Sequence, residues 1–123
     1  MPSRSLVSKE LASLLSVLAH PDRIQIIEAL VREEHNVNSL KDILGVSHSR
    51  VSQHLSLLRS HRLVRERHEG RRHYYRLSNP KLAAWIVDGL QFLDTELKVS
   101  DDIHRAVSEV RELWTGEVEN ESG

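Results

Sequence analysis

The side chains best suited to binding a ligand are concentrated between His48 and Arg76. This segment contains eight Arg, no Lys and two Glu, although the 123-residue chain as a whole has a net charge of −1. A local excess of +6 is therefore balanced by −7 in the rest of the chain. Positive charge confined to one segment is typical of a surface that binds a polyanion.

Motifs for catalysis are missing from the same sequence. It contains no glycine-rich phosphate loop, no Gly-x-Ser-x-Gly elbow and no complete His/Glu metal motif. With no cysteine, disulfides, thiolate metal sites and thiol redox chemistry are excluded. We therefore expect a binding protein without a cofactor, not an enzyme. The absence of a long apolar run and of a leader pattern predicts a cytoplasmic protein with no membrane partner.

Two short helices joined by a glycine turn are predicted at the start of the basic segment, over residues 39–60. Ser39 can cap a helix over residues 40–44, and Gly45 suits the left-handed conformation at its end. Ser47 can cap a second helix, in which the apolar positions face inward. This pattern is typical of a helix-turn-helix.

The outer face of that second helix carries side chains that can read DNA bases. Gln53 can form two hydrogen bonds with adenine, and Arg50 can do so with guanine or hold a phosphate. An ordinary solvated face is the alternative. His54 falls on the inward edge, where we expect a partly buried histidine bonded to backbone. The predicted reading residues are His48, Ser49, Arg50, Ser52 and Gln53.

A β-hairpin is predicted directly after the helix-turn-helix, over residues 63–77. Residues 63–67 and 73–77 alternate in strand fashion, and Gly70 supplies the turn between them. A hairpin in this position is a wing, whose tip could enter the minor groove or grip phosphate. The predicted wing and phosphate contacts are Arg65, Arg67, His68, Arg71 and Arg72.

The flanking segments carry apolar stripes at helical spacing, which predict helices over about 6–19, 80–97 and 101–114. Pro21 is placed to start a further helix. We expect residues 1–5 to be flexible, 6–114 to form one domain and 115–123 to be a disordered acidic tail. The stripe over 80–97 is too continuous for one small core to cover, and this favours a two-fold dimer.

Four blocks of sequence, residues 18–23, 40–46, 47–58 and 70–77, together resemble the winged-helix repressors of the ArsR/SmtB family. The resemblance implies a mainly α fold with a small β-hairpin, in the order α-α-α-α-β-β-α plus a C-terminal helix. It also implies a homodimeric repressor that binds an inverted repeat in double-stranded DNA and is released by a signal. In such a dimer the first and fifth helices pair, through Leu11, Leu14, Leu15, Leu82, Ile86, Leu90 and Leu93.

The inducing signal is the part of this interpretation that stays open. The metal ligands that the family carries near its third helix and on its fifth helix are missing here, so we expect no metal. Asp102 and His104 lack completing ligands, and His68 and His73 form a pair without a third. The remaining interpretations are a small apolar or amphipathic inducer near Trp85, Phe92 or Trp114, or no inducer at all. The eight histidines also leave open an unconventional His/carboxylate metal site and a response to pH. A winged helix used only for protein–protein contact is the alternative function.

Overall fold

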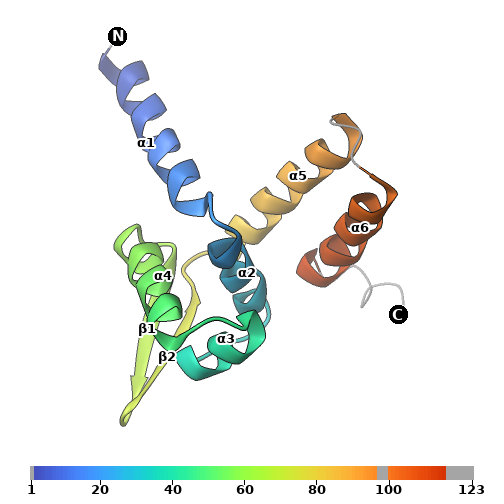
Figure 1. The fold of residues 1–123 in the computed structure, drawn as a ribbon. Helices are drawn as coiled ribbons and strands as arrows, with labels where there is room; N and C mark the ends of the chain where they lie inside the picture. The colour runs from blue at the N-terminus through green and yellow to red at the C-terminus, as the bar shows by residue number, and fades with distance from the viewer. Residues whose placement is uncertain (1, 97–99, 116–123) are drawn as a thin grey trace. The chain divides into compact units, whose positions relative to one another are not determined.

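The computed structural model describes residues 2–96 and 100–115. Its elements are α1 (Pro2–Leu18), α2 (Pro21–Leu30), α3 (Val37–Leu44), α4 (His48–Ser60), β1 (Val64–Glu69), β2 (Arg72–Leu77), α5 (Lys81–Glu96) and α6 (Asp101–Thr115). This order, visible in Figure 1, confirms the predicted mainly α fold with one hairpin. Within these ranges, no helix has the length and apolar character needed to cross a membrane.

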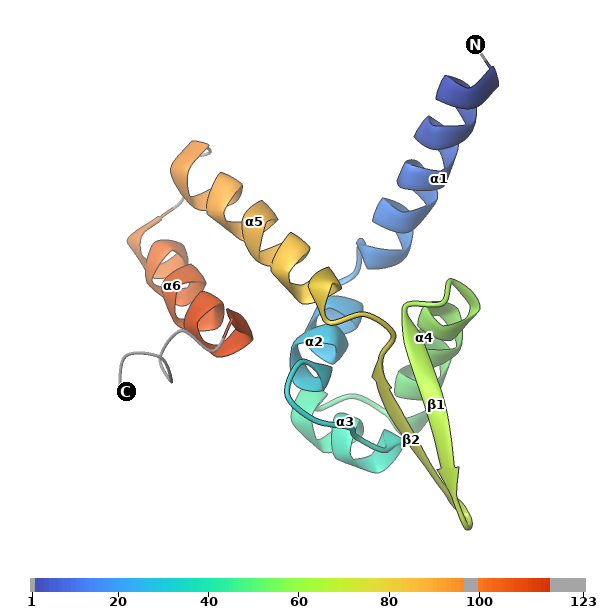
Figure 2. The same ribbon diagram turned by 180° about the vertical axis from the view of Figure 1, so that it is seen from behind.

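The chain divides into two compact units, Met1–Ser78 and Asn79–Gly123, where the sequence predicted one domain over residues 6–114. In the second unit α5 and α6 lie side by side, as Figure 2 shows. His104 Nδ1 lies 2.5 Å from Asp94 Oδ1, and the guanidinium of Arg111 donates to the side chain of Gln91. The apolar stripe over residues 80–97 does not show which element packs against it, so the sequence alone could not divide the chain into these two units.

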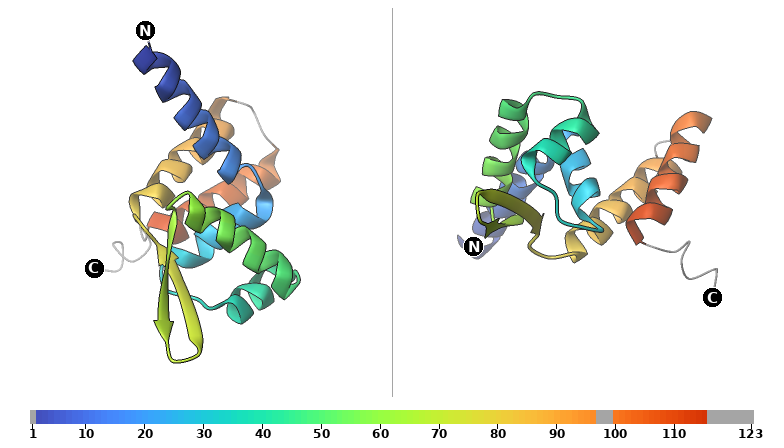
Figure 3. Two further views of the ribbon diagram at one scale, coloured as in Figure 1. Left: turned by 90° about the vertical axis from the view of Figure 1, so that its left-hand side faces the viewer. Right: turned by 90° about the horizontal axis from the view of Figure 1, so that it is seen from below.

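The core of the first unit is made by α2, α3, α4 and the base of the hairpin. Both views in Figure 3 show α3 and α4 next to each other, joined by a short turn. Side chains from all of these elements are almost fully buried, so the two helices of the helix-turn-helix are held by one continuous apolar cluster. Its members include Ile26, Ile27, Leu40, Val51, Leu55, Leu58, Val64 and Leu77.

The helix ends follow local sequence signals, with two corrections. Ser47 caps α4, and Gly45 ends α3 with φ of 71°, both as predicted. The cap of α3 is Asn36 and not Ser39: the Asn36 side chain accepts a hydrogen bond from the Ser39 N–H at 2.8 Å. Asn is as good a cap as Ser and lies one turn earlier, so the helix gains a turn.

The second correction concerns the N-terminus. The sequence predicted a flexible segment over residues 1–5, but α1 begins at Pro2. Proline is tolerated at the first helical position, and extending an existing helix is far easier than nucleating one. The predicted acidic tail over 115–123 begins at the last residue of α6, and residues 116–123 lie outside the described part of the chain.

The hairpin has two faces with different chemistry. Its strands pair in antiparallel register, with Val64 opposite Leu77 and His68 opposite His73. Since side chains alternate along a strand, Glu66 shares the face of His68, and this face includes the buried base of the hairpin. Gly70 opens the two-residue turn with φ of 61°, a conformation that favours glycine.

Candidate nucleic-acid interface

Helix α4 presents the predicted reading residues to solvent. The Ser47 hydroxyl accepts a hydrogen bond from the Arg50 N–H at 3.1 Å, which fixes the first turn of the helix. Of the five predicted residues, Ser52 is half-buried and the others are exposed. The opposite face is anchored by the buried side chains Val51, Leu55 and Leu58. The arrangement leaves a polar strip about two turns long free to enter a groove.

Arg50 is linked to the body of the protein as well as exposed. Its Nε atom lies 3.8 Å from Oδ2 of Asp22, at the start of α2, while its side chain remains 60% exposed. A pair this open to water is weak, and an incoming phosphate or guanine can compete for the guanidinium. Arg50 can therefore pair with Asp22 in the free protein and bind a phosphate or guanine in a complex.

His54 is buried behind the reading face, as predicted, but its partners are side chains and not backbone. Its Nδ1 atom lies 3.3 Å from Nη1 of Arg23, and its Nε2 atom lies 3.3 Å from Oδ2 of Asp22. The ring of His20 lies 4.5 Å from that of His54, centroid to centroid. Burial, together with the neighbouring His20, lowers the pKa of His54 below its ordinary value of 6.5.

This lowered pKa predicts acid sensitivity of the fold. Because the unfolded chain binds the proton more readily, His54 favours the folded state above pH 6.5, and this contribution falls as pH drops toward the folded pKa. The limiting slope for one proton is about 1.4 kcal/mol per pH unit. Urea unfolding of wild type and His54→Gln between pH 8 and 5 should show a shallower decline in the variant. Gln25→Ala, at an exposed position on α2 without a titrating side chain, should keep the wild-type slope.

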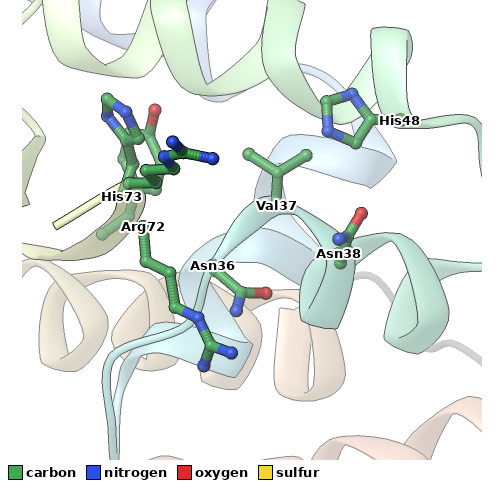
Figure 4. Close-up of a pocket in the computed structure, with 8 residues that line it drawn as sticks. Asn36, Val37, Asn38, His48, Arg72 and His73 are labelled. Carbon is green, nitrogen blue, oxygen red and sulfur yellow. The ribbon is translucent and has the colours of Figure 1, made fainter. Parts of the chain in front are cut away.

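The tip of the wing adjoins a basic hollow beside the helix-turn-helix. Figure 4 shows side chains from the start of α3, from the start of α4 and from β2 around it. Within the described part of the chain, no acidic side chain lines this hollow, so it suits a phosphate oxygen. The structure thus brings His48 together with both predicted arginines of the tip. The lining residues are Asn36, Val37, Asn38, His48, Arg71, Arg72, His73 and Tyr75.

Arg67 lies on the wing with an exposed side chain, and its guanidinium is paired with carboxylates. Its guanidinium donates to both carboxylate oxygens of Glu34, at 2.9–3.2 Å, and to Glu69 at 2.8 Å. It also lies 4.8 Å from the ring centroid of Tyr74. The hydrogen bonds to Glu34 and then Glu69 raise the pKa of Arg67, so its charge is held by the protein's own carboxylates. Arg65, by contrast, is exposed opposite Arg76 on the other strand.

Glu66 joins the two wing histidines, a contact that the sequence analysis missed. Its Oε1 atom lies 2.5 Å from Nε2 of His68 and 3.1 Å from Nδ1 of His73. Its other oxygen accepts from the Tyr75 hydroxyl at 2.9 Å and from Arg59 at 3.1 Å. The hydrogen bond with His73 leads the effects that lower the pKa of Glu66. Two-residue spacing from Glu66 to His68 on a strand was the available signal.

The predicted dimer residues divide between the two units. On α1, Leu11 and Leu15 are 47% and 49% exposed, and Leu14 is half-buried. On α5, Leu82, Ile86, Leu90 and Leu93 are all half-buried. Each helix therefore keeps accessible apolar surface along the predicted stripe.

The aromatic residues suggested for an apolar inducer are exposed where they are described. Trp85 is 44% exposed and Phe92 is 59% exposed, and the Trp114 side chain lies outside the described part. Asp102 and His104, considered above as an incomplete metal pair, are also placed by the structure: the His104 side chain pairs with Asp94 on α5.

Comparisons with known proteins agree with this geometry. Residues 20–66 match the family described as bacterial regulatory protein, arsR family. The nodulation protein NolR of Rhizobium meliloti is 43% identical over 68 residues, which are 55% of this chain and 56% of that protein. The biofilm growth-associated repressor of Xylella fastidiosa is 35% identical over 83 residues, covering 68% of this chain and 72% of the repressor.

A solved structure extends the likeness to the fold. The homodimeric winged helix-turn-helix DNA-binding domain from Mycobacterium bovis superposes with a TM-score of 0.67 at 28% identity, over 76% of this chain and 87% of that one. Among the curated relatives, the match with NolR spans little more than half of the relative's length.

Proposed function

This chain belongs to the ArsR family of bacterial regulatory proteins, and from that premise we propose that it is a dimeric transcriptional repressor that binds an inverted repeat in double-stranded DNA. The observation that carries the proposal is the exposed polar strip of α4 beside the basic hollow at the wing tip. An α-helix fits the major groove of B-DNA, where base edges present distinct donors and acceptors.

The two parts of the interface would divide the work. Gln53, Ser49 and Ser52 offer hydrogen bonds to base edges, which carry sequence information. Arg71, Arg72 and His48 surround a hollow suited to phosphate, and Arg65 adds exposed charge nearby. Arg67 is left out of this proposed interface because Glu34 and Glu69 already hold its charge.

Dimerisation is part of the proposal, since the exposed leucines of α1 and the half-buried stripe of α5 are poorly covered in a single chain. A two-fold dimer would place two α4 helices in successive major grooves, with half-site centres about 34–36 Å apart. The homodimeric domain from Mycobacterium bovis supports this assembly. An inducer would act by changing the spacing of the two reading helices.

The test is selection of bound duplexes from a random pool, done in parallel for wild type and Gln53→Ala. We expect wild type to enrich a palindrome and Gln53→Ala to lose preference at one base pair in each half-site. Loss of a good bidentate base contact costs about 1–3 kcal/mol of discrimination, or roughly 5- to 150-fold.

The matched control is Gln25→Ala, a change of the same residue type at an exposed position on α2. It should enrich the wild-type palindrome unchanged. Failure of wild type to enrich any palindrome would contradict the proposed function and favour a winged helix that binds protein partners. If Gln53→Ala selects the same base preferences as wild type, Gln53 does not contact a base.

A further inference from the structure

The inward face of the wing gathers two imidazoles and a carboxylate, the donor set of many zinc and iron sites. The cluster consists of Glu66 and His68 on β1 and His73 on β2. One ligand atom from each of the three lies within 4.8 Å of the other two. We propose that Glu66, His68 and His73 form a binding site for one divalent transition-metal ion of the Zn²⁺ type. The site goes beyond the proposed DNA binding and does not depend on it.

The hairpin register explains why these three side chains meet. His68 and His73 are direct cross-strand partners, with ring centroids 4.2 Å apart. Glu66 is two residues before His68, so it projects from the same face of the strand. The site therefore requires only the backbone pairing that the wing already has. Glu66 supplies the third ligand that the His68–His73 pair lacks in the sequence analysis.

The distances leave an ion a short adjustment away. A tetrahedral Zn²⁺ with bonds of about 2.0–2.2 Å spaces its ligand atoms about 3.3–3.5 Å apart. Oε1 of Glu66 lies 2.5 Å from His68 Nε2 and 3.1 Å from His73 Nδ1. Both imidazoles thus turn one nitrogen toward the same carboxylate oxygen, and lengthening each of these two distances by less than one ångström gives the spacing of tetrahedral ligands.

Neighbouring side chains orient the carboxylate through hydrogen bonds, as groups bonded to metal ligands do in metal sites. The Tyr75 hydroxyl and the Arg59 guanidinium both donate to Oε2 of Glu66, at 2.9 and 3.1 Å. Oε1 is consequently the oxygen left to face the histidines. The Glu66 side chain is only 10% exposed, whereas His68 and His73 are 62% and 47% exposed, so an ion can enter from solvent.

A second group of three potential ligands, His20, Asp22 and His54, is a poorer candidate. His20 Nδ1 accepts a hydrogen bond from the Asp22 N–H at 3.0 Å, so that lone pair is used. The guanidinium of Arg23 lies 3.3 Å from His54 Nδ1, and that of Arg50 lies 3.8 Å from Asp22. Arginines thus contact two of the three potential ligands in this group, whereas in the wing cluster Arg59 contacts only Glu66, through the oxygen that does not face the histidines.

The experiment is calorimetric titration of the metal-free 123-residue chain with Zn²⁺, supported by the visible absorption of bound Co²⁺. Wild type should bind one ion per chain. His68→Ala and His73→Ala should each weaken Zn²⁺ binding by about a hundredfold or more, since losing even a side chain that only orients a ligand costs about 10–100-fold. Glu66→Gln should weaken it too and alter the Co²⁺ spectrum.

Two histidine variants serve as controls, His61→Ala beyond α4 and His20→Ala in the competing group. Both should bind Zn²⁺ as wild type does, and thermal unfolding in chelator should show that His68→Ala and His73→Ala remain folded. The proposal is overturned if wild type binds no Zn²⁺, if folded His68→Ala and His73→Ala bind it normally, or if His20→Ala is the variant that loses it.

Discussion

Reversing both arginines at the wing tip, Arg71→Glu with Arg72→Glu, should lower affinity for duplex DNA by on the order of a thousandfold near physiological salt. Both side chains are exposed beside a hollow whose lining, among the described residues, includes no acid, so their charge is available to phosphate. In a dimer the change removes four cations and adds four anions. The loss should be similar for a selected palindrome and a scrambled duplex, because phosphate contacts carry no sequence information.

Salt dependence provides the sharper measurement. Each phosphate contact contributes about −0.9 to the slope of log affinity against log salt, so losing four contacts should flatten the slope by about 3–4. Fluorescence anisotropy at several salt concentrations between 50 and 200 mM gives both affinity and slope. Arg105→Glu on α6 changes the charge as much as either single wing variant and should leave the slope unchanged. A wild-type slope near zero would refute the electrostatic basis of the interface.

The parts of the fold that the sequence predicted well depend on short-range physics. Ser47 lies three residues before the N–H it caps, and Gly45 and Gly70 adopt the positive φ that their turns require. The basic segment is contiguous in sequence, so its charge excess could be counted directly. One of the two local errors, Ser39 for Asn36, arose because two good capping residues compete within a single turn.

The contacts that the sequence did not predict join residues far apart in the chain. Arg67 and Glu34 are separated by 33 positions, and His54 and Arg23 by 31. No periodicity encodes such pairs, because they depend on how α2, α4 and the hairpin pack. One contact pairs the exposed Arg67 guanidinium with Glu34, and the other holds His54 at the back of α4.

The Glu66 cluster lies between these two cases. Its members are close in sequence, and strand alternation places Glu66 and His68 on one face. Pairing His68 with His73 needs the hairpin register, which the turn at Gly70 determines. The sequence analysis therefore predicted the His68–His73 pair but missed Glu66, the carboxylate that both histidines contact.

Leu55→Ala should destabilise the fold by about 2–5 kcal/mol, the range for truncating a fully buried leucine. Leu55 is 1% exposed and projects from α4 into the cluster formed with Ile26, Ile27 and Leu40. Small domains have total stabilities of about 5–15 kcal/mol, so the loss is a large share of the whole. Urea unfolding monitored by circular dichroism measures it directly.

The matched control is Ser56→Ala, the next residue on the same helix, which is exposed. It should change stability by less than about 0.5 kcal/mol. Leu55 faces away from the polar strip. The folded Leu55→Ala protein should therefore lose DNA affinity only if the cavity displaces α4, and part of the lost affinity should return at lower temperature. A loss of stability below about 1 kcal/mol would mean that α4 is not held by this core, and the rigid presentation of Gln53 would then lack its support.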